Sequence, residues 1–118
     1  MEYTQEQHEA VRRSVEQLFR DVAARFARAT VREVPGPNGR DGLIELSCSL
    51  PGTARVAALP GADQIDLYVG AKTWLELMPT RRNPEKPLAS VKTIVELVVA
   101  GRFEERIRMR KVRYVAYA

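Results

Sequence analysis

The sequence is poor in the side chains that most often build reactive or metal-binding sites, since its 118 residues include one cysteine, one histidine and one tryptophan. The single cysteine, Cys48, excludes an internal disulfide and fits a reducing compartment. The single histidine, His8, cannot form a metal cluster, and a nucleophilic Cys48 would have no other imidazole as its base. We therefore interpret Cys48 as a small core residue and expect His8 to be exposed on a helix.

Membrane and nucleotide-binding signatures are also missing. No aliphatic run is longer than the one at residues 97–100, whereas a membrane-spanning helix needs about 20 apolar residues. The first residues include acids and amides where a signal peptide carries cations, and the glycines form neither common phosphate-binding motif. We expect a cytoplasmic protein that binds no membrane and carries no cofactor or metal.

The sequence offers no set of acid, base and nucleophile at a telling spacing, which argues against an enzyme. Asp63 and Asp66 are candidates for a cation site or for acid–base chemistry, but such a site would need a further acid or histidine nearby. Turn formation explains Asp41 and Asp63 more simply.

What is present is typical of one soluble domain, residues 1–118, because 45% of the residues are hydrophobic and 29% are charged. Thr4 and Gln7 form a capping box, and apolar residues recur at spacings of three and four behind them. This pattern predicts a long amphipathic helix over residues 5–29.

A second helix is predicted over residues 88–100, which are apolar almost all round. Pro87 suits the first turn of a helix, and Gly101 suits a left-handed C-cap. The high β-branched content would also suit a strand, but the length before the glycine favours a helix. This helix should be buried more deeply than the first.

Segments of strand-like pattern fill the rest of the chain between turn-forming residues. Residues 73–78 suit either a short strand or one helical turn. The alternation of residues 102–110 slips by one near Arg110, so that Tyr114 falls on the arginine side, and a bulge or a turn would explain the slip. The other expected strands are 30–34, 43–50, 55–59, 64–69 and 112–117. The order predicts an α+β fold, an antiparallel sheet of about five strands with both helices on one face.

All of the net charge lies near the C-terminus. Residues 102–118 contain six cations and two anions, a net charge of +4 that equals the formal net charge of the chain. A basic strand suggests an acidic partner. A simpler interpretation is a solvated sheet face that Glu33, Glu45 or Asp66 neutralises from neighbouring strands. The candidate partner-binding residues here are Arg102, Arg106, Arg108, Arg110 and Tyr114.

Two further candidate contacts lie earlier in the chain. Arg81 and Arg82 occupy an exposed, proline-rich loop, which is more often a solvated connection than a binding site. Trp74 is either a recognition anchor or a cover of the core, and the core is the more common place for a tryptophan.

YVGAKTWLEL at residues 68–77, followed by IVELVVAGRFEE at 94–105, resembles the small bacterial immunity proteins of polymorphic toxin systems. The resemblance covers roughly the C-terminal half. It implies a cytoplasmic protein with no chemistry of its own that binds and blocks one cognate toxin domain. Many such proteins are acidic because their toxins are basic nucleases, whereas this chain is basic.

The leading hypothesis is therefore a non-catalytic binding protein, of the immunity or adaptor type, that recognises an acidic partner surface. The alternative is a small nucleic-acid-binding domain that uses the same cations with Tyr114 and Tyr117. Residues 112–117 carry apolar or aromatic groups on both faces. They would therefore either pair with a second copy or partner by strand addition, or lie inside the sheet.

Overall fold

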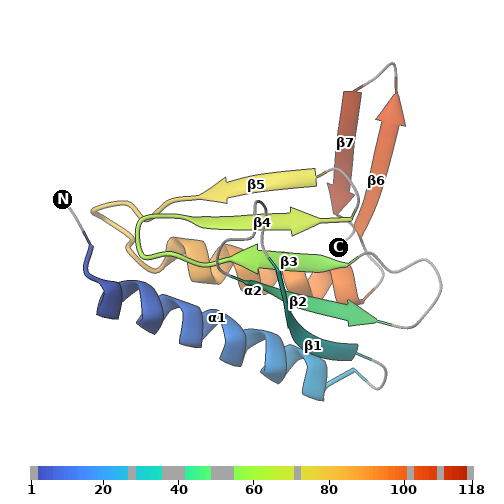
Figure 1. Cartoon of the computed structure of the whole chain (residues 1–118). Coiled ribbons are helices and arrows are strands. Elements are labelled where there is room, and N and C mark those ends of the chain that lie inside the picture. Colours follow the sequence, from blue (N-terminus) through green and yellow to red (C-terminus); the bar gives the residue numbers. More distant parts are fainter. Residues whose placement is uncertain are drawn as a thin grey trace.

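The computed structural model describes residues 3–26, 29–35, 42–48, 55–70, 73–100, 103–108 and 111–116, the last two ranges as backbone. A five-stranded antiparallel sheet forms one layer, with the strands in chain order from β1 to β5. Both helices cover one face of this sheet, and a separate two-stranded ribbon, β6–β7, stands at one end (Figure 1). The predicted α+β fold, with an antiparallel five-stranded sheet and two helices on one face, is confirmed.

The first helix, α1, covers Gln5–Ala24 and begins with the predicted capping box. The Thr4 hydroxyl accepts from the Gln7 amide at 3.1 Å, and the Gln7 side chain accepts from the Thr4 amide at 2.7 Å. Val15, Phe19 and Val22 form its buried stripe. The helix ends earlier than the predicted residue 29, because the chain must turn back there to enter β1.

The second helix, α2, covers Lys86–Val99, so the helical interpretation of this apolar segment is correct. Pro87 lies in its first turn, where the missing N–H costs no hydrogen bond. Val91, Val95 and Val98 are buried against the sheet and α1. The predicted C-cap, Gly101, lies outside the described residues.

The five strands of the sheet pair in a simple meander. Ile44, Leu46, Ile65 and Leu67 face the helices and form the centre of the core. The ambiguous segment after residue 72 is the edge strand β5, since it pairs with β4 along its whole length. The strands are β1 (Ala29–Val34), β2 (Leu43–Cys48), β3 (Val56–Leu59), β4 (Ile65–Val69) and β5 (Thr73–Leu77).

The ribbon consists of β6 (Phe103–Arg108) and β7 (Lys111–Ala116), which pair antiparallel with each other. Arg108 lies opposite Lys111, so the chain reverses between them. The slip in the sequence pattern is therefore the turn of a hairpin and not a bulge. Figure 1 shows the ribbon rising beside the end of the sheet where β4 ends and β5 begins, and β7 lies next to β5.

Candidate protein-binding surfaces

The ribbon brings cations of two strands to the same face. Arg106 lies opposite Arg113, and Arg108 lies opposite Lys111. Because residues alternate between the two faces of a strand, these four positions share one face, which we call the basic face. Like charges directly opposite each other destabilise a strand pair, so this face favours contact with anionic groups.

The turn of the hairpin places Tyr114 on the other face of the ribbon. Tyr114 lies opposite Glu105, and Ile107 lies opposite Val112 on that face. The sequence pattern had put Tyr114 on the arginine side, and the reversal of the chain explains the difference. Two of the predicted contacts, Arg102 and Arg110, lie outside the described residues, as does Tyr117.

The acids that were expected to neutralise this face from neighbouring strands do not lie on neighbouring strands, because β6 pairs with β7. Glu33 instead accepts from Arg12 Nη2 at 2.6 Å. Glu45 accepts from Nε of Arg32, and Asp66 accepts from the side-chain amide of Gln64. Cross-strand neutralisation by these three acids is therefore wrong.

Arg81 and Arg82 lie at the tip of a tight turn and are both exposed. Thr80 and Asn83 close this turn, since the Asn83 amide donates to the Thr80 carbonyl at 3.2 Å and to the Thr80 hydroxyl at 3.0 Å. The two arginines are thus held on a defined turn and are not part of a loose linker. This turn follows β5 at the end of the sheet away from the ribbon (Figure 1), so the two arginines form a separate cationic point.

Trp74 is exposed to 55%, so the interpretation of Trp74 as a cover of the core is wrong. It lies on β5 opposite Tyr68 of β4, and the two rings are stacked with their centroids 6.4 Å apart and an angle of 8° between their planes. Leu67 and Val69 are buried under the helices, so Tyr68 between them lies on the face that the helices leave uncovered. Met78, which directly follows β5, is also exposed, to 57%.

A pair of acids lies next to the aromatic pair on the same two strands. Asp66 of β4 is directly opposite Glu76 of β5, two residues from Tyr68 and Trp74 respectively. Burial raises the pKa of the Tyr68 phenol, and the charge of Asp66 raises it further. With its pKa raised, the Tyr68 phenol stays neutral to a higher pH than a free tyrosine does. We call the four residues Asp66, Tyr68, Trp74 and Glu76 the acidic–aromatic patch.

On the same face of the sheet as this patch, but on β2, a buried carboxylate lies between two arginines. The Glu45 side chain is only 8% exposed, and its Oε1 accepts from Nε of Arg32 at 3.0 Å. Its Oε2 lies 3.8 Å from Nη1 of Arg55. The small residues Ala57 and Gly70 leave a hollow of about 240 Å³ between Glu45 and Tyr68. The sequence placed Glu45 on the polar face correctly, but its burial was not expected.

His8 is half-buried and not fully exposed as expected. Its Nδ1 accepts from the Ala62 amide at 3.0 Å and lies 3.8 Å from Asp63 Oδ1. A Cβ on Gly61 would come within 3.0 Å of the Gln64 carbonyl, which explains the glycine at this close approach. His8 thus joins the start of α1 to the turn between β3 and β4, a structural role.

Comparison with known proteins adds no information on these surfaces. No family model, curated protein or solved structure matches the chain. Within the described residues, neither helix is long and apolar enough to cross a bilayer, and His, Cys, Asp and Glu side chains form no group of three that could hold a metal ion. Cys48 is half-buried at the end of β2.

Proposed function

We propose that this chain is a non-catalytic protein-binding protein, of the immunity or adaptor type, that recognises an acidic partner surface with the basic face of its ribbon. The observation that carries the proposal is the register of β6 and β7, which sets Arg106 against Arg113 and Arg108 against Lys111. Four cations on one face of a short ribbon attract carboxylates and repel other cationic surfaces.

The ribbon also has the geometry of a protruding contact element. It forms its own two-stranded sheet, and it rises from the end of the larger sheet (Figure 1). Each of its strands has one hydrogen-bonded neighbour among the described strands, so strand addition by a partner or a second copy remains open to both. Arg81 and Arg82, at their own exposed turn, are a second cationic contact under this proposal.

An acidic protein is favoured over nucleic acid by what lies near the cations. Tyr114, the aromatic residue that would stack a base, is on the opposite face from Arg106 and Arg108. The other aromatic pair, the exposed Trp74 and the half-buried Tyr68, has Asp66 and Glu76 beside it, and these acids repel a phosphate backbone.

The charge reversals Arg106→Glu and Arg108→Glu test the proposal. The probe is a fluorescently labelled peptide of twelve glutamates, compared with single-stranded and double-stranded DNA that carry the same number of phosphates. We expect the double variant to bind the glutamate peptide at least about tenfold more weakly, because two attractive contacts become repulsive. Its melting temperature should change little, since the two residues lie on a ribbon outside the main sheet.

The matched control is the double variant Arg13→Glu and Lys92→Glu, which changes the net charge equally on the exposed surfaces of α1 and α2. If both double variants lose binding equally, net charge and not the ribbon explains it, and the proposal fails. Tighter binding of DNA than of the glutamate peptide, with a steep dependence on salt, would instead support the nucleic-acid alternative.

The immunity form of the proposal adds that the acidic partner is a toxin domain. Co-expression with a toxin domain encoded beside this gene should restore bacterial growth, and the variant with Arg106→Glu and Arg108→Glu should restore it less. Growth inhibition that persists beside the unaltered protein would leave only the adaptor form.

A further inference from the structure

The face of the sheet that the helices leave uncovered carries aromatic and acidic side chains, whose charge is opposite in sign to that of the ribbon. Its centre is the stacked pair of Tyr68 and Trp74, and Trp74 exposes 55% of its surface. Asp66 and Glu76 lie beside this pair, on the same two strands and the same face. An exposed tryptophan that is stacked on a tyrosine is typical of a protein contact and not of a solvated surface.

The chemistry of the acidic–aromatic patch selects a cation. The face of an indole or phenol ring attracts a guanidinium or ammonium group, and an arginine stacks its planar guanidinium on such rings. Residues directly opposite on neighbouring antiparallel strands have their Cβ atoms about 5 Å apart. Asp66 and Glu76 therefore bring two negative charges close together on this face of the sheet.

The described residues around the patch leave its negative charge in place, so the patch still attracts a cation. Asp66 accepts a hydrogen bond from the Gln64 side chain, which leaves its negative charge in place. The cross-strand row that contains Tyr68 and Trp74 runs through Ala57 to Glu45 and Arg32, and Arg32 pairs there with the buried Glu45. Arg55, which directly precedes β3, lies outside this row, and its Nη1 is 3.8 Å from Oε2 of Glu45. Ala57 lies between Glu45 and Tyr68 in that row and has no bulk to cover the tyrosine ring.

We propose that the acidic–aromatic patch is a docking site for an arginine-bearing segment of a partner protein, whose guanidinium stacks on Tyr68 and Trp74 and pairs with Asp66 and Glu76. The site lies on β4 and β5, at the β5 end of the strand order of the sheet. This inference does not depend on the ribbon or on the function proposed for it, since it uses a different surface and a different charge.

Trp74 makes the test direct, because it is the only tryptophan in the chain and its emission reports on the patch alone. The probe is an acetylated, amidated peptide of three Arg-Gly repeats. The matched ligand control is the same peptide with citrulline in place of arginine, which keeps the planar side-chain group and removes the charge. We expect the arginine peptide to change the Trp74 emission saturably and the citrulline peptide to bind at least about tenfold more weakly.

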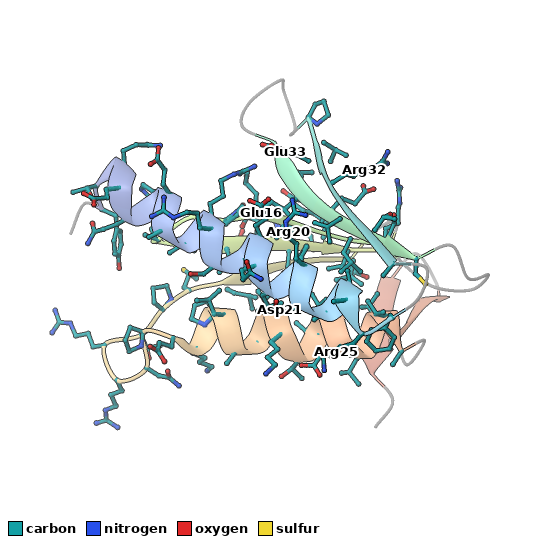
Figure 2. All side chains as sticks on the ribbon, turned by 90° about the horizontal axis from the view of Figure 1, so that it is seen from below. Glu16, Arg20, Asp21, Arg25, Arg32 and Glu33 are labelled. Atoms are coloured by element: carbon teal, nitrogen blue, oxygen red, sulfur yellow. The ribbon has the colours of Figure 1, made fainter. Side chains whose placement is uncertain are left out.

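The variant that tests the acids carries Asp66→Asn and Glu76→Gln, which keep the side-chain size. It should bind the arginine peptide at least about tenfold more weakly, with an unchanged circular dichroism spectrum. The control variant carries Glu16→Gln and Asp21→Asn on α1, on the helical side of the molecule (Figure 2). It removes the same two charges and should bind as the unaltered protein does.

Three results would overturn the proposal. Equal responses to the arginine and citrulline peptides would show that charge is not read at the patch. Equal losses in the two charge variants would show that net charge alone attracts the peptide. A change of Trp74 emission with protein concentration alone, abolished by Arg106→Glu and Arg108→Glu, would show that the ribbon of a second copy occupies the patch in place of a separate partner.

Discussion

Glu45 shows how a single charged residue fixes the uncovered face of the sheet. Its carboxylate is almost buried, and a carboxylate in that position is stable only when its charge is matched and its oxygens accept hydrogen bonds. Arg32 provides this match from the opposite position on β1, and Arg55 lies beside the second oxygen. The three side chains therefore help to hold β1 in register with β2, although β1 is an edge strand.

Thr73 carries a hydroxyl group in a buried position. It is 6% exposed at the start of β5, and its hydroxyl has no hydrogen-bond partner among the residues that the structure describes. A buried hydroxyl without a partner costs free energy that an isosteric methyl group does not. We expect Thr73→Val to raise the free energy of unfolding by about 1 kcal/mol, measured by urea denaturation.

The matched control for this substitution is Thr93→Val on α2. The Thr93 hydroxyl is exposed and donates to the Ala89 carbonyl at 3.1 Å, so its loss should change the stability by less than about 0.5 kcal/mol. A lower urea midpoint for Thr73→Val would mean that the Thr73 hydroxyl is satisfied in solution, contrary to the structure.

At the scale of the elements, α1 begins with a complete capping box. Thr4 and Gln7 each satisfy a backbone amide that would otherwise lack a partner at the helix start. Thr4→Ala should lower the free energy of unfolding by about 1 kcal/mol, whereas Thr4→Ser keeps the accepting oxygen and should restore most of it. Thermal melts of the three proteins measure this, and equal stability of the alanine and serine variants would count against the cap.

The first helix and the strands β2 and β4 could be predicted from sequence because each has a clear period. The second helix is apolar almost all round, so its length before Gly101, and not a period, predicted it. The end of α1 could not be predicted, since the apolar spacing continues through Phe26 while the helix stops at Ala24. Residues 73–77 suit both a helical turn and a strand, and only their pairing with β4 decides between the two. Such pairing is a tertiary effect that local periodicity does not contain.

The residues of the candidate surfaces could be predicted from the sequence more readily than their positions relative to one another. The cations of β6 were evident from composition, but their position opposite Arg113 and Lys111 depends on where the hairpin turns. The stack of Tyr68 on Trp74 had a signal in the short connection around Gly70, whose φ of 66° suits glycine and marks a hairpin. The Glu45–Arg32 contact joins strands across the long segment after Val34, and no local pattern predicts such a register.

At the scale of the whole molecule, the charges are separated between two parts. Residues 102–118 contain the whole net charge of +4, so the part with the helices and the larger sheet is neutral as a sum. Within that neutral part, Asp66 and Glu76 make the β4–β5 edge locally negative. The chain thus presents a cationic arm and an anionic edge, and a partner that carries both signs would contact the two at once.

Truncation after Ala100 tests whether the ribbon is an arm or a part of the core. The buried side chains of the described core run from Val15 to Val99, and the ribbon hydrogen-bonds within itself. We expect the shortened protein to unfold cooperatively, with a melting temperature lower by only a few degrees, which corresponds to about 1 kcal/mol. It should lose binding of the glutamate peptide and keep the Trp74 response to the arginine peptide.

The control for the truncation is the full-length chain with Arg106, Arg108, Lys111 and Arg113 all replaced by glutamate, which removes the basic face and keeps the ribbon backbone. It should lose the glutamate peptide in the same way. Suppose that circular dichroism shows the truncated protein to be unfolded and the full-length glutamate variant to be folded. The ribbon would then complete the core through its packing beside β5. The interpretation of the ribbon as an independent arm would be wrong.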